Sequence, residues 1–251
     1  MTACLPNQAD AARRSPPAGL LRRNGWAILV AGGLTIFVQL AIFAAASAAM
    51  ASPASDMAAL LGSLLWLVLA APIFAAGGRC LLDGMVRAGA VIDAGIVVLV
   101  VLAASGGAVG PLAAVKIYLL WCAVALTECA VTQQAAAPRK RFILGIVAAT
   151  AVLITAAGPF WTNAIVQSAE GPWANRMALA VTASNPVYAT VATVPQAKFV
   201  WNEMPILYEL TVLGRDVAIR TCPWYATAIG YAVVALLLML RAHVGRRRRL
   251  T

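Results

Sequence analysis

The chain has 251 residues, of which 62% are hydrophobic and 11% are charged, and its net charge is +10. A soluble domain carries about one charged residue in four, so this composition excludes an ordinary soluble protein and favours a membrane protein. The apolar runs are long and continuous, which indicates membrane helices and argues against alternating strands. The basic residues flank these runs, where they set topology and contact anionic lipid at the tails; no basic and aromatic residues interleave to favour nucleic acid.

The N-terminal region is predicted to form an irregular cytoplasmic tail over residues 1–25, because prolines and alternating charges disfavour a long helix. The first apolar run covers residues 26–48. Small residues at 46–51 resemble a signal-peptide cleavage site, but the apolar run exceeds the about 7–15 residues of a signal core. We therefore expect a retained first span, with a cleaved signal as the alternative.

Further apolar runs follow in chain order and are predicted to be membrane spans. They cover residues 57–77, 90–104, 112–132, 142–160 and 224–242. If the N-terminus is cytoplasmic, the inner segments hold 14 of the 19 lysines and arginines, as the positive-inside rule requires. The sequence thus predicts an all-α polytopic protein of a bacterial inner membrane, with six transmembrane helices and both termini inside.

The predicted organisation has four parts. Residues 26–160 hold spans 1–5, residues 161–223 form an extracytoplasmic helical segment, and residues 224–251 hold span 6 and a basic cytoplasmic tail. Within the external segment, two short helices are expected to meet at Asn185-Pro186, and residues 196–222 are expected to form a compact piece at the outer interface. Cys222 is the only cysteine on the outer side in this topology, which excludes an internal disulfide there.

The inner loop between spans 2 and 3, residues 78–89, is predicted to form a short amphipathic helix. Its apolar residues share one face, and its charged residues fall at i, i+4 and i+8 on the other, giving two pairs of opposite charge. Such a helix either lies on the lipid headgroups or docks a cytoplasmic partner. The candidate docking residues are Arg79, Leu81, Leu82, Asp83, Met85 and Arg87.

Ionisable residues within the predicted spans are Asp93, Lys116 and Glu128. Such residues are costly in lipid and are candidates for function. Asp93, near the inner end of its predicted span, and Lys116, near the outer end, are expected to reach an interface. Glu128 is expected to pair with Arg79, Arg87 or the basic residues 139–141, a structural role that we favour over a proton relay.

The chain carries no motif of a known catalytic or metal centre. HExxH, GxSxG, P-loop and CxxC motifs are absent, and His243 is the only histidine. We therefore expect no enzyme activity in this chain itself, no cofactor and no metal site.

In its layout the chain resembles the membrane subunits of type-2 ABC exporters. The resemblance lies in the helix at 79–87 between spans 2 and 3, the external segment 161–223 with its Ser184-Asn185-Pro186 break, and the apolar ending 225–240 followed by basic residues. It implies a permease that moves substrate outward as a homodimer or heterodimer, driven by a separate ATP-binding-cassette ATPase subunit that docks on the 79–87 helix. The alternative function is a non-transporting scaffold or assembly factor whose outer loop binds a partner.

Overall fold

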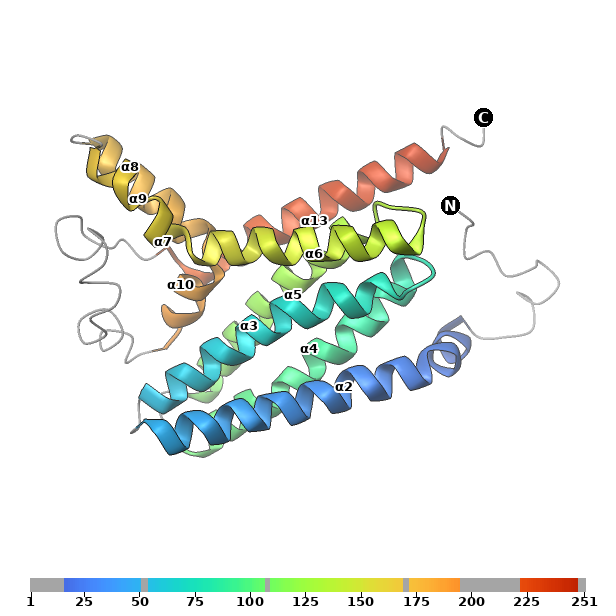
Figure 1. Ribbon diagram of the computed structural model, residues 1–251, viewed down its shortest axis with the longest axis horizontal. Coiled ribbons are helices and arrows are strands. Elements are labelled where there is room, and N and C mark those ends of the chain that lie inside the picture. Colours follow the sequence, from blue (N-terminus) through green and yellow to red (C-terminus); the bar gives the residue numbers. More distant parts are fainter. Residues whose placement is uncertain (1–15, 51–53, 107–108, 169–171, 195–221, 248–251) are drawn as a thin grey trace.

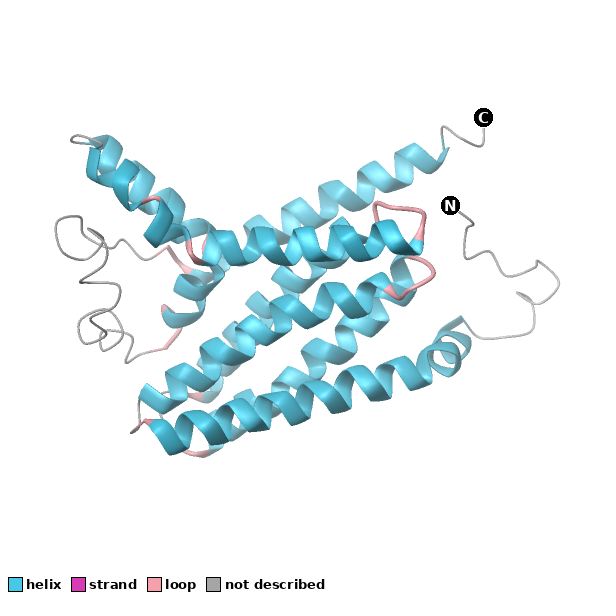
Figure 2. Cartoon of the chain, viewed as in Figure 1, coloured by secondary structure: helices cyan, strands magenta, loops and turns pink. Residues whose placement is uncertain are grey.

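The computed structural model of the chain describes residues 16–50, 54–106, 109–168, 172–194 and 222–247, and within these ranges it contains helices and no strand (Figures 1 and 2). Five helices in the described ranges are long and apolar enough to cross a membrane. They are Asn24–Ala49, Ala54–Ala76, Leu81–Ala104, Pro111–Thr132 and Trp224–Ala242. The prediction of an all-α, multi-pass membrane protein is confirmed for this part of the chain.

In the described ranges, six long helices form the bundle and four short helices lie at one end of it (Figure 1). The long helices are α2 (Pro16–Ala49), α3 (Ala54–Ala76), α4 (Leu81–Ala104), α5 (Pro111–Thr132), α6 (Pro138–Ala156) and α13 (Trp224–Arg247). The short helices are α7 (Gly158–Trp161), α8 (Asn163–Ser168), α9 (Pro172–Ser184) and α10 (Pro186–Val191). Connections 77–80 and 133–137 lie at the end where α2 begins, here called the basic end; the short helices lie at the opposite end.

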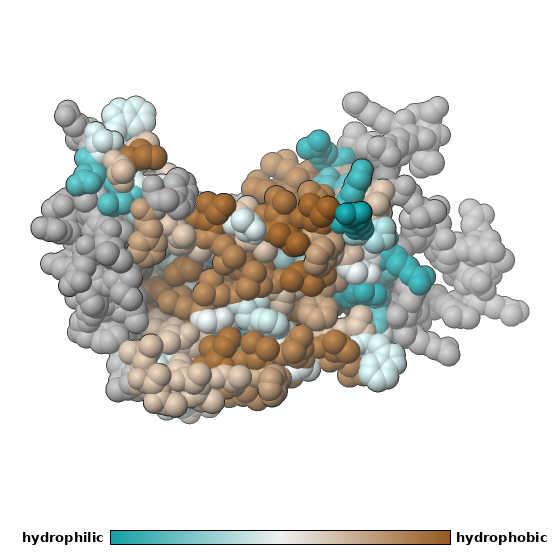
Figure 3. All heavy atoms as spheres, viewed as in Figure 1, coloured by the Kyte–Doolittle hydropathy of each residue, from teal (hydrophilic) through white to brown (hydrophobic). Residues whose placement is uncertain are grey.

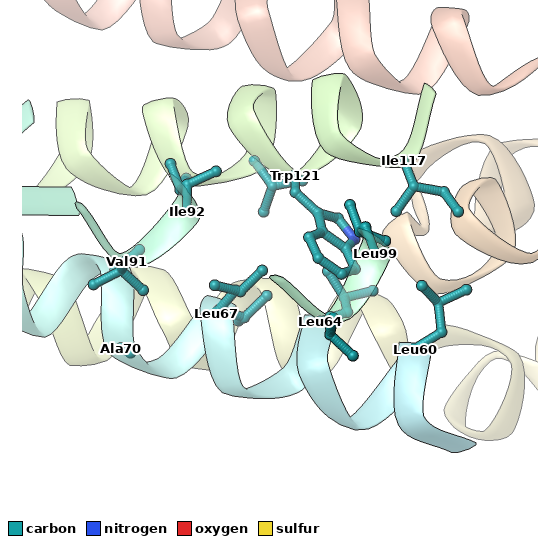
Figure 4. Packing of buried hydrophobic residues seen from close by; sticks show 14 of the residues in the cluster. Leu60, Leu64, Leu67, Ala70, Val91, Ile92, Leu99, Ile117 and Trp121 are labelled. Carbon is teal, nitrogen blue, oxygen red and sulfur yellow. The ribbon is translucent and has the colours of Figure 1, made fainter. Parts of the chain in front are cut away.

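The core forms where α3, α4 and α5 pack together, with α2 against α3 and α4, α6 against α3 and α5, and α13 along α5. Leu64 and Leu67 of α3 and Leu99 of α4 surround the indole of Trp121, which projects from α5 between them (Figure 4). Hydrophobic residues also cover the visible outer face over α2, α3 and α6, whereas hydrophilic residues gather at the basic end and over α8 and α9 (Figure 3). An apolar outer face is expected where lipid tails replace water as the solvent.

The predicted irregular tail extends too far along the chain. Helix α2 begins at Pro16, so residues 16–25 are helical rather than irregular. Pro16 and Pro17 occupy the first turn, where a missing N–H breaks no intrahelical hydrogen bond and the fixed φ suits a helix. The prolines therefore start this helix instead of preventing it.

The separate amphipathic helix predicted at 78–89 is also wrong. The connection between α3 and α4 is limited to residues 77–80, and residues 81–89 are the first turns of α4. Leu81 and Met85 pack against the core, and Asp83 is buried. Because these residues have partners inside the bundle, the helix continues straight into the membrane span.

The break predicted at Asn185-Pro186 is present. Helix α9 ends at Ser184, α10 begins at Pro186, and Asn185 between them has extended backbone angles, so two short helices do meet at this break. Residues 195–221, which include most of the predicted compact piece, lie outside the described ranges, as do residues 1–15 and 248–251 of the two tails.

Candidate functional site

A buried polar cluster joins α2 to the start of α4 at the basic end. Asn24 of α2 donates through Nδ2 to Asp83 Oδ1 at 3.0 Å, and its Oδ1 accepts from Arg87 Nε at 2.8 Å. The backbone N–H of Arg79 donates to Asp83 Oδ2 at 3.3 Å. Asn24 thus bridges the carboxylate and the guanidinium, and the Asp83 side chain is 0% exposed. This cluster holds the first turn of α4 against α2.

A second set of buried contacts fixes the two connections at the basic end. Gln133 at the end of α5 donates to the carbonyl of Ala75 at 2.7 Å, and a Cβ added to Gly84 would lie 2.6 Å from Gln133 Nε2. The glycine therefore permits this close approach of α4 to α5. Arg141 of α6 is buried and donates to the carbonyls of Ala135, Ala136 and Gly78, which ties the 133–137 connection to the 77–80 connection.

The six candidate docking residues have very different surroundings in the structure. Arg79 is exposed and Leu82 is 51% exposed, so both are accessible at the basic end. Leu81 and Met85 pack against the core, while Asp83 and Arg87 bond to Asn24. Two of the three residues of the predicted charged face, Asp83 and Arg87, therefore lie in an internal contact, and Arg79 remains exposed. A docking surface at this corner is reduced to Arg79 and Leu82.

Two exposed basic residues extend that surface. Arg139 and Lys140 lie in the first turn of α6 and are exposed, and the neighbouring Arg141 reaches Gly78 in the α3–α4 connection. We call Arg79, Leu82, Arg139 and Lys140 together the basic rim. Its charge suits an acidic protein surface or anionic headgroups.

Glu128 does not make the predicted ion pair. Its side chain is 1% exposed, and neither carboxylate oxygen has a hydrogen-bond partner among the described residues. Arg87 and Arg141, two of the basic residues expected to pair with it, bond to Asn24 and to backbone carbonyls instead. Glu128 lies on the same face of α5 as Trp121, which projects into the core.

Asp93 and Lys116 lie at different depths. Lys116 follows the first residue of α5 by five positions, near the opposite end, as the sequence predicted. Asp93 lies 12 residues after the start of α4 and 11 before its end, because α4 begins earlier than predicted. It is exposed on the side of the bundle and accepts a hydrogen bond from the Tyr118 hydroxyl at 2.7 Å. Asp93 therefore lies midway along α4 rather than near one end of it.

Helix α10 is inserted among the long helices at the opposite end. The Asn185 side chain accepts from the backbone N–H groups of Val187 and Tyr188 at 2.9 and 3.3 Å, which caps α10, and donates to the carbonyl of Ala156 at the end of α6 at 2.9 Å. Five of the six residues of α10 are buried, and the helix contacts α3, α5, α6 and α13. The Asn-Pro break therefore turns the chain back into the bundle.

Sequence reasoning missed Asn24, Gln133 and Arg141 as structural polar groups. Each lies beside an apolar run, where a polar residue normally reads as the border of a span. Polar residues at such borders are a signal for contacts between helices, but the partners that Asn24, Gln133 and Arg141 reach in another helix or connection lie 58 to 63 residues away along the chain.

The geometry defines a helical membrane bundle in which hydrogen bonds of polar side chains hold the helices together at both ends. Within the described ranges, no three His, Cys, Asp or Glu side chains are placed to hold a metal ion. Comparison of the chain with protein-family models, with curated proteins and with solved structures found no match.

Proposed function

We propose that the chain crosses the membrane six times, with the basic end in the cytoplasm, and serves as the permease subunit of an ABC-type exporter. The span added to the five helices named above is α6, the fifth in chain order. Its 19 residues are about 28 Å long, close to the thickness of a bilayer core. It packs against α3 and α5 within the bundle. Its first turn carries Arg139, Lys140 and Arg141, which suits the cytoplasmic side.

The observation that carries the exporter proposal is the inserted helix α10. Irregular backbone at membrane depth is tolerated where protein covers it, and α10 meets this condition because it contacts four long helices and most of its residues are buried. A broken helical segment that folds back between the last two spans is the feature that the resemblance to type-2 exporters implies. In such a permease, movement of α5, α6 and α13 would move this segment with them, which offers a gate on the outer side.

The ATPase subunit of this exporter would dock on the basic rim. The rim combines three exposed cations with the exposed Leu82 at the joined connections 77–80 and 133–137. Since Arg141 ties these connections together, a displacement of the basic rim by the docked subunit would move the adjoining ends of α3, α4, α5 and α6 together. The permease would act as a homodimer or heterodimer with a substrate moved outward.

One observation favours the second candidate, a membrane scaffold or assembly factor without transport. The α3–α4 connection has only residues 77–80, and no separate coupling helix lies between α3 and α4, which the structure describes without a gap. A scaffold needs no such lever, and its outer segment would bind the partner.

The exporter proposal is tested by purifying the tagged chain from native membranes in mild detergent. We expect an ATP-binding-cassette subunit to co-purify and its ATP hydrolysis to be stimulated by the chain. Replacing Leu82 with aspartate should lower its recovery about tenfold or more, because a carboxylate then stands at the centre of the contact. Leu81 is left unchanged because it packs against the core.

The matched control is Leu112→Asp, which changes an exposed leucine at the opposite end of the bundle. It should leave the ATPase recovery unchanged. Purification without any ATPase, or equal recovery with Leu82→Asp, would refute docking on the basic rim. An outer partner found in place of the ATPase would support the scaffold.

A further inference from the structure

Asp93 is a carboxylate at the middle of α4, a helix long and apolar enough to cross a membrane, and it is exposed on the outside of the bundle. The distances from Asp93 to the two ends of α4 correspond to about 17–18 Å along the helix axis. Lysine and arginine can extend from such depths toward headgroups, whereas the short aspartate side chain cannot. A lipid-exposed acid in this position is costly to insert into a bilayer, so a partner for the carboxylate is expected.

The structure supplies only part of that partner. The Tyr118 hydroxyl of α5 donates to Oδ1, and within the described residues no group donates to Oδ2 and no lysine or arginine pairs with the carboxylate. An ionised carboxylate accepts about four hydrogen bonds or an adjacent cation. Most of the hydrogen-bonding capacity of the Asp93 carboxylate is therefore unused on its exposed side.

The surface around Asp93 is apolar. On α4, Ile96 and Val100 follow at i+3 and i+7 and are exposed. On α5, Val115 precedes Tyr118 by three residues and is exposed as well. The face shared by α4 and α5 thus presents one negative group, one phenol and a set of aliphatic side chains.

A second copy of the chain does not fit this face. In a twofold dimer the same surface meets itself, so two Asp93 carboxylates would approach each other. Lys116, near the start of α5, lies two residues before Tyr118, and this offset of about 200° around the helix points it away from the face of Asp93. A twofold dimer through this face would therefore bring two carboxylates together without a cation between them.

We propose that Asp93 and Tyr118 form a lateral binding site for a lipophilic cation that reaches it from the bilayer. The carboxylate pairs with an ammonium or phosphonium centre, the Tyr118 ring offers it a cation–π contact, and the apolar groups of the ligand lie on Ile96, Val100 and Val115. That such a cation is the substrate of the exporter rests on the proposed function. That it binds at Asp93 and Tyr118 does not depend on that function.

The test uses tetraphenylphosphonium and the purified chain in lipid nanodiscs, with empty nanodiscs to subtract partition into lipid. We expect saturable binding by the wild type, which Asp93→Asn weakens about tenfold or more because the charge is lost. Asp93→Glu should restore binding, and Tyr118→Phe should weaken it about fivefold through loss of one hydrogen bond. Glu128→Gln, which changes a membrane-embedded carboxyl on the core face of α5, should bind as the wild type does.

Equal binding by wild type and Asp93→Asn overturns the proposal, and so does equal competition by neutral tetraphenylsilane. If Asp93→Asn instead changes the oligomeric state while binding stays constant, the face belongs to a protein contact and the ligand site is refuted. Since no ATPase is present, failure here leaves the exporter proposal standing, and absence of an ATPase partner leaves a positive binding result intact.

Discussion

Replacing Asp83 with alanine is expected to lower the free energy of unfolding by about 2–4 kcal/mol. The change removes the acceptor of the Asn24 side chain and of the Arg79 backbone N–H in a fully buried place. It also loosens Asn24, which holds Arg87. The loss is measured by equilibrium unfolding of the purified protein in mixed micelles, followed by circular dichroism.

The matched control is Arg79→Ala. Arg79 stands four residues from Asp83 and its side chain is exposed, while its backbone N–H, which the variant keeps, makes the contact with Asp83. We expect a change of less than about 0.5 kcal/mol. If both variants unfold alike, the buried cluster contributes nothing particular to the stability of the bundle.

Replacing Trp121 with alanine is expected to cost about 3 kcal/mol, at the low end for loss of a buried tryptophan. Its side chain is 1% exposed and fills the space between α3 and α4 (Figure 4). Because lipid rather than water surrounds the bundle, the loss comes mainly from packing contacts and the cavity left behind. The same unfolding measurement applies.

Trp26→Ala serves as the comparison, since Trp26 of α2 is 82% exposed and leaves no internal cavity when shortened. Its effect on unfolding is expected to lie within about 0.5 kcal/mol of zero. A cost for Trp26→Ala as large as that for Trp121→Ala would mean that the indole of Trp121 does not organise the core.

The sequence predicted well those features that depend on local pattern. Apolar runs of about 20 residues located the long helices, because a bilayer demands that length whatever the neighbours are. The break between α9 and α10 was predictable because Asn185-Pro186 has a local cause: proline cannot continue a helix, and asparagine caps the next one.

The features that were missed depend on contacts between distant parts of the chain. Residues 79–87 have an amphipathic pattern, and a charged stripe on a helix usually faces water. Here Asn24, 59 residues before Asp83, supplies a polar partner inside the bundle, so that Asp83 and Arg87 make an internal contact. Asp93 lies midway along α4 rather than near one end, because α4 begins at Leu81 instead of at residue 90.

Glu128 shows that basic residues nearby in the sequence do not ensure an ion pair. Nearby basic residues in the sequence suggested a partner, but proximity along the chain did not bring one to its carboxylate in the described part of the structure. The direction in which each helix face points is decided by packing with the other helices. A single sequence carries that information only weakly.

The central claim is that α6 crosses the membrane and the basic end lies in the cytoplasm. It is tested most directly by single-cysteine labelling of intact cells with a membrane-impermeant maleimide, in a variant whose native cysteines are replaced. Lys140→Cys at the start of α6 and Gln167→Cys in α8 are both exposed positions on either side of this helix. We predict that Gln167→Cys reacts from outside and Lys140→Cys reacts only after permeabilisation; labelling of both from the same side would contradict the six-span account.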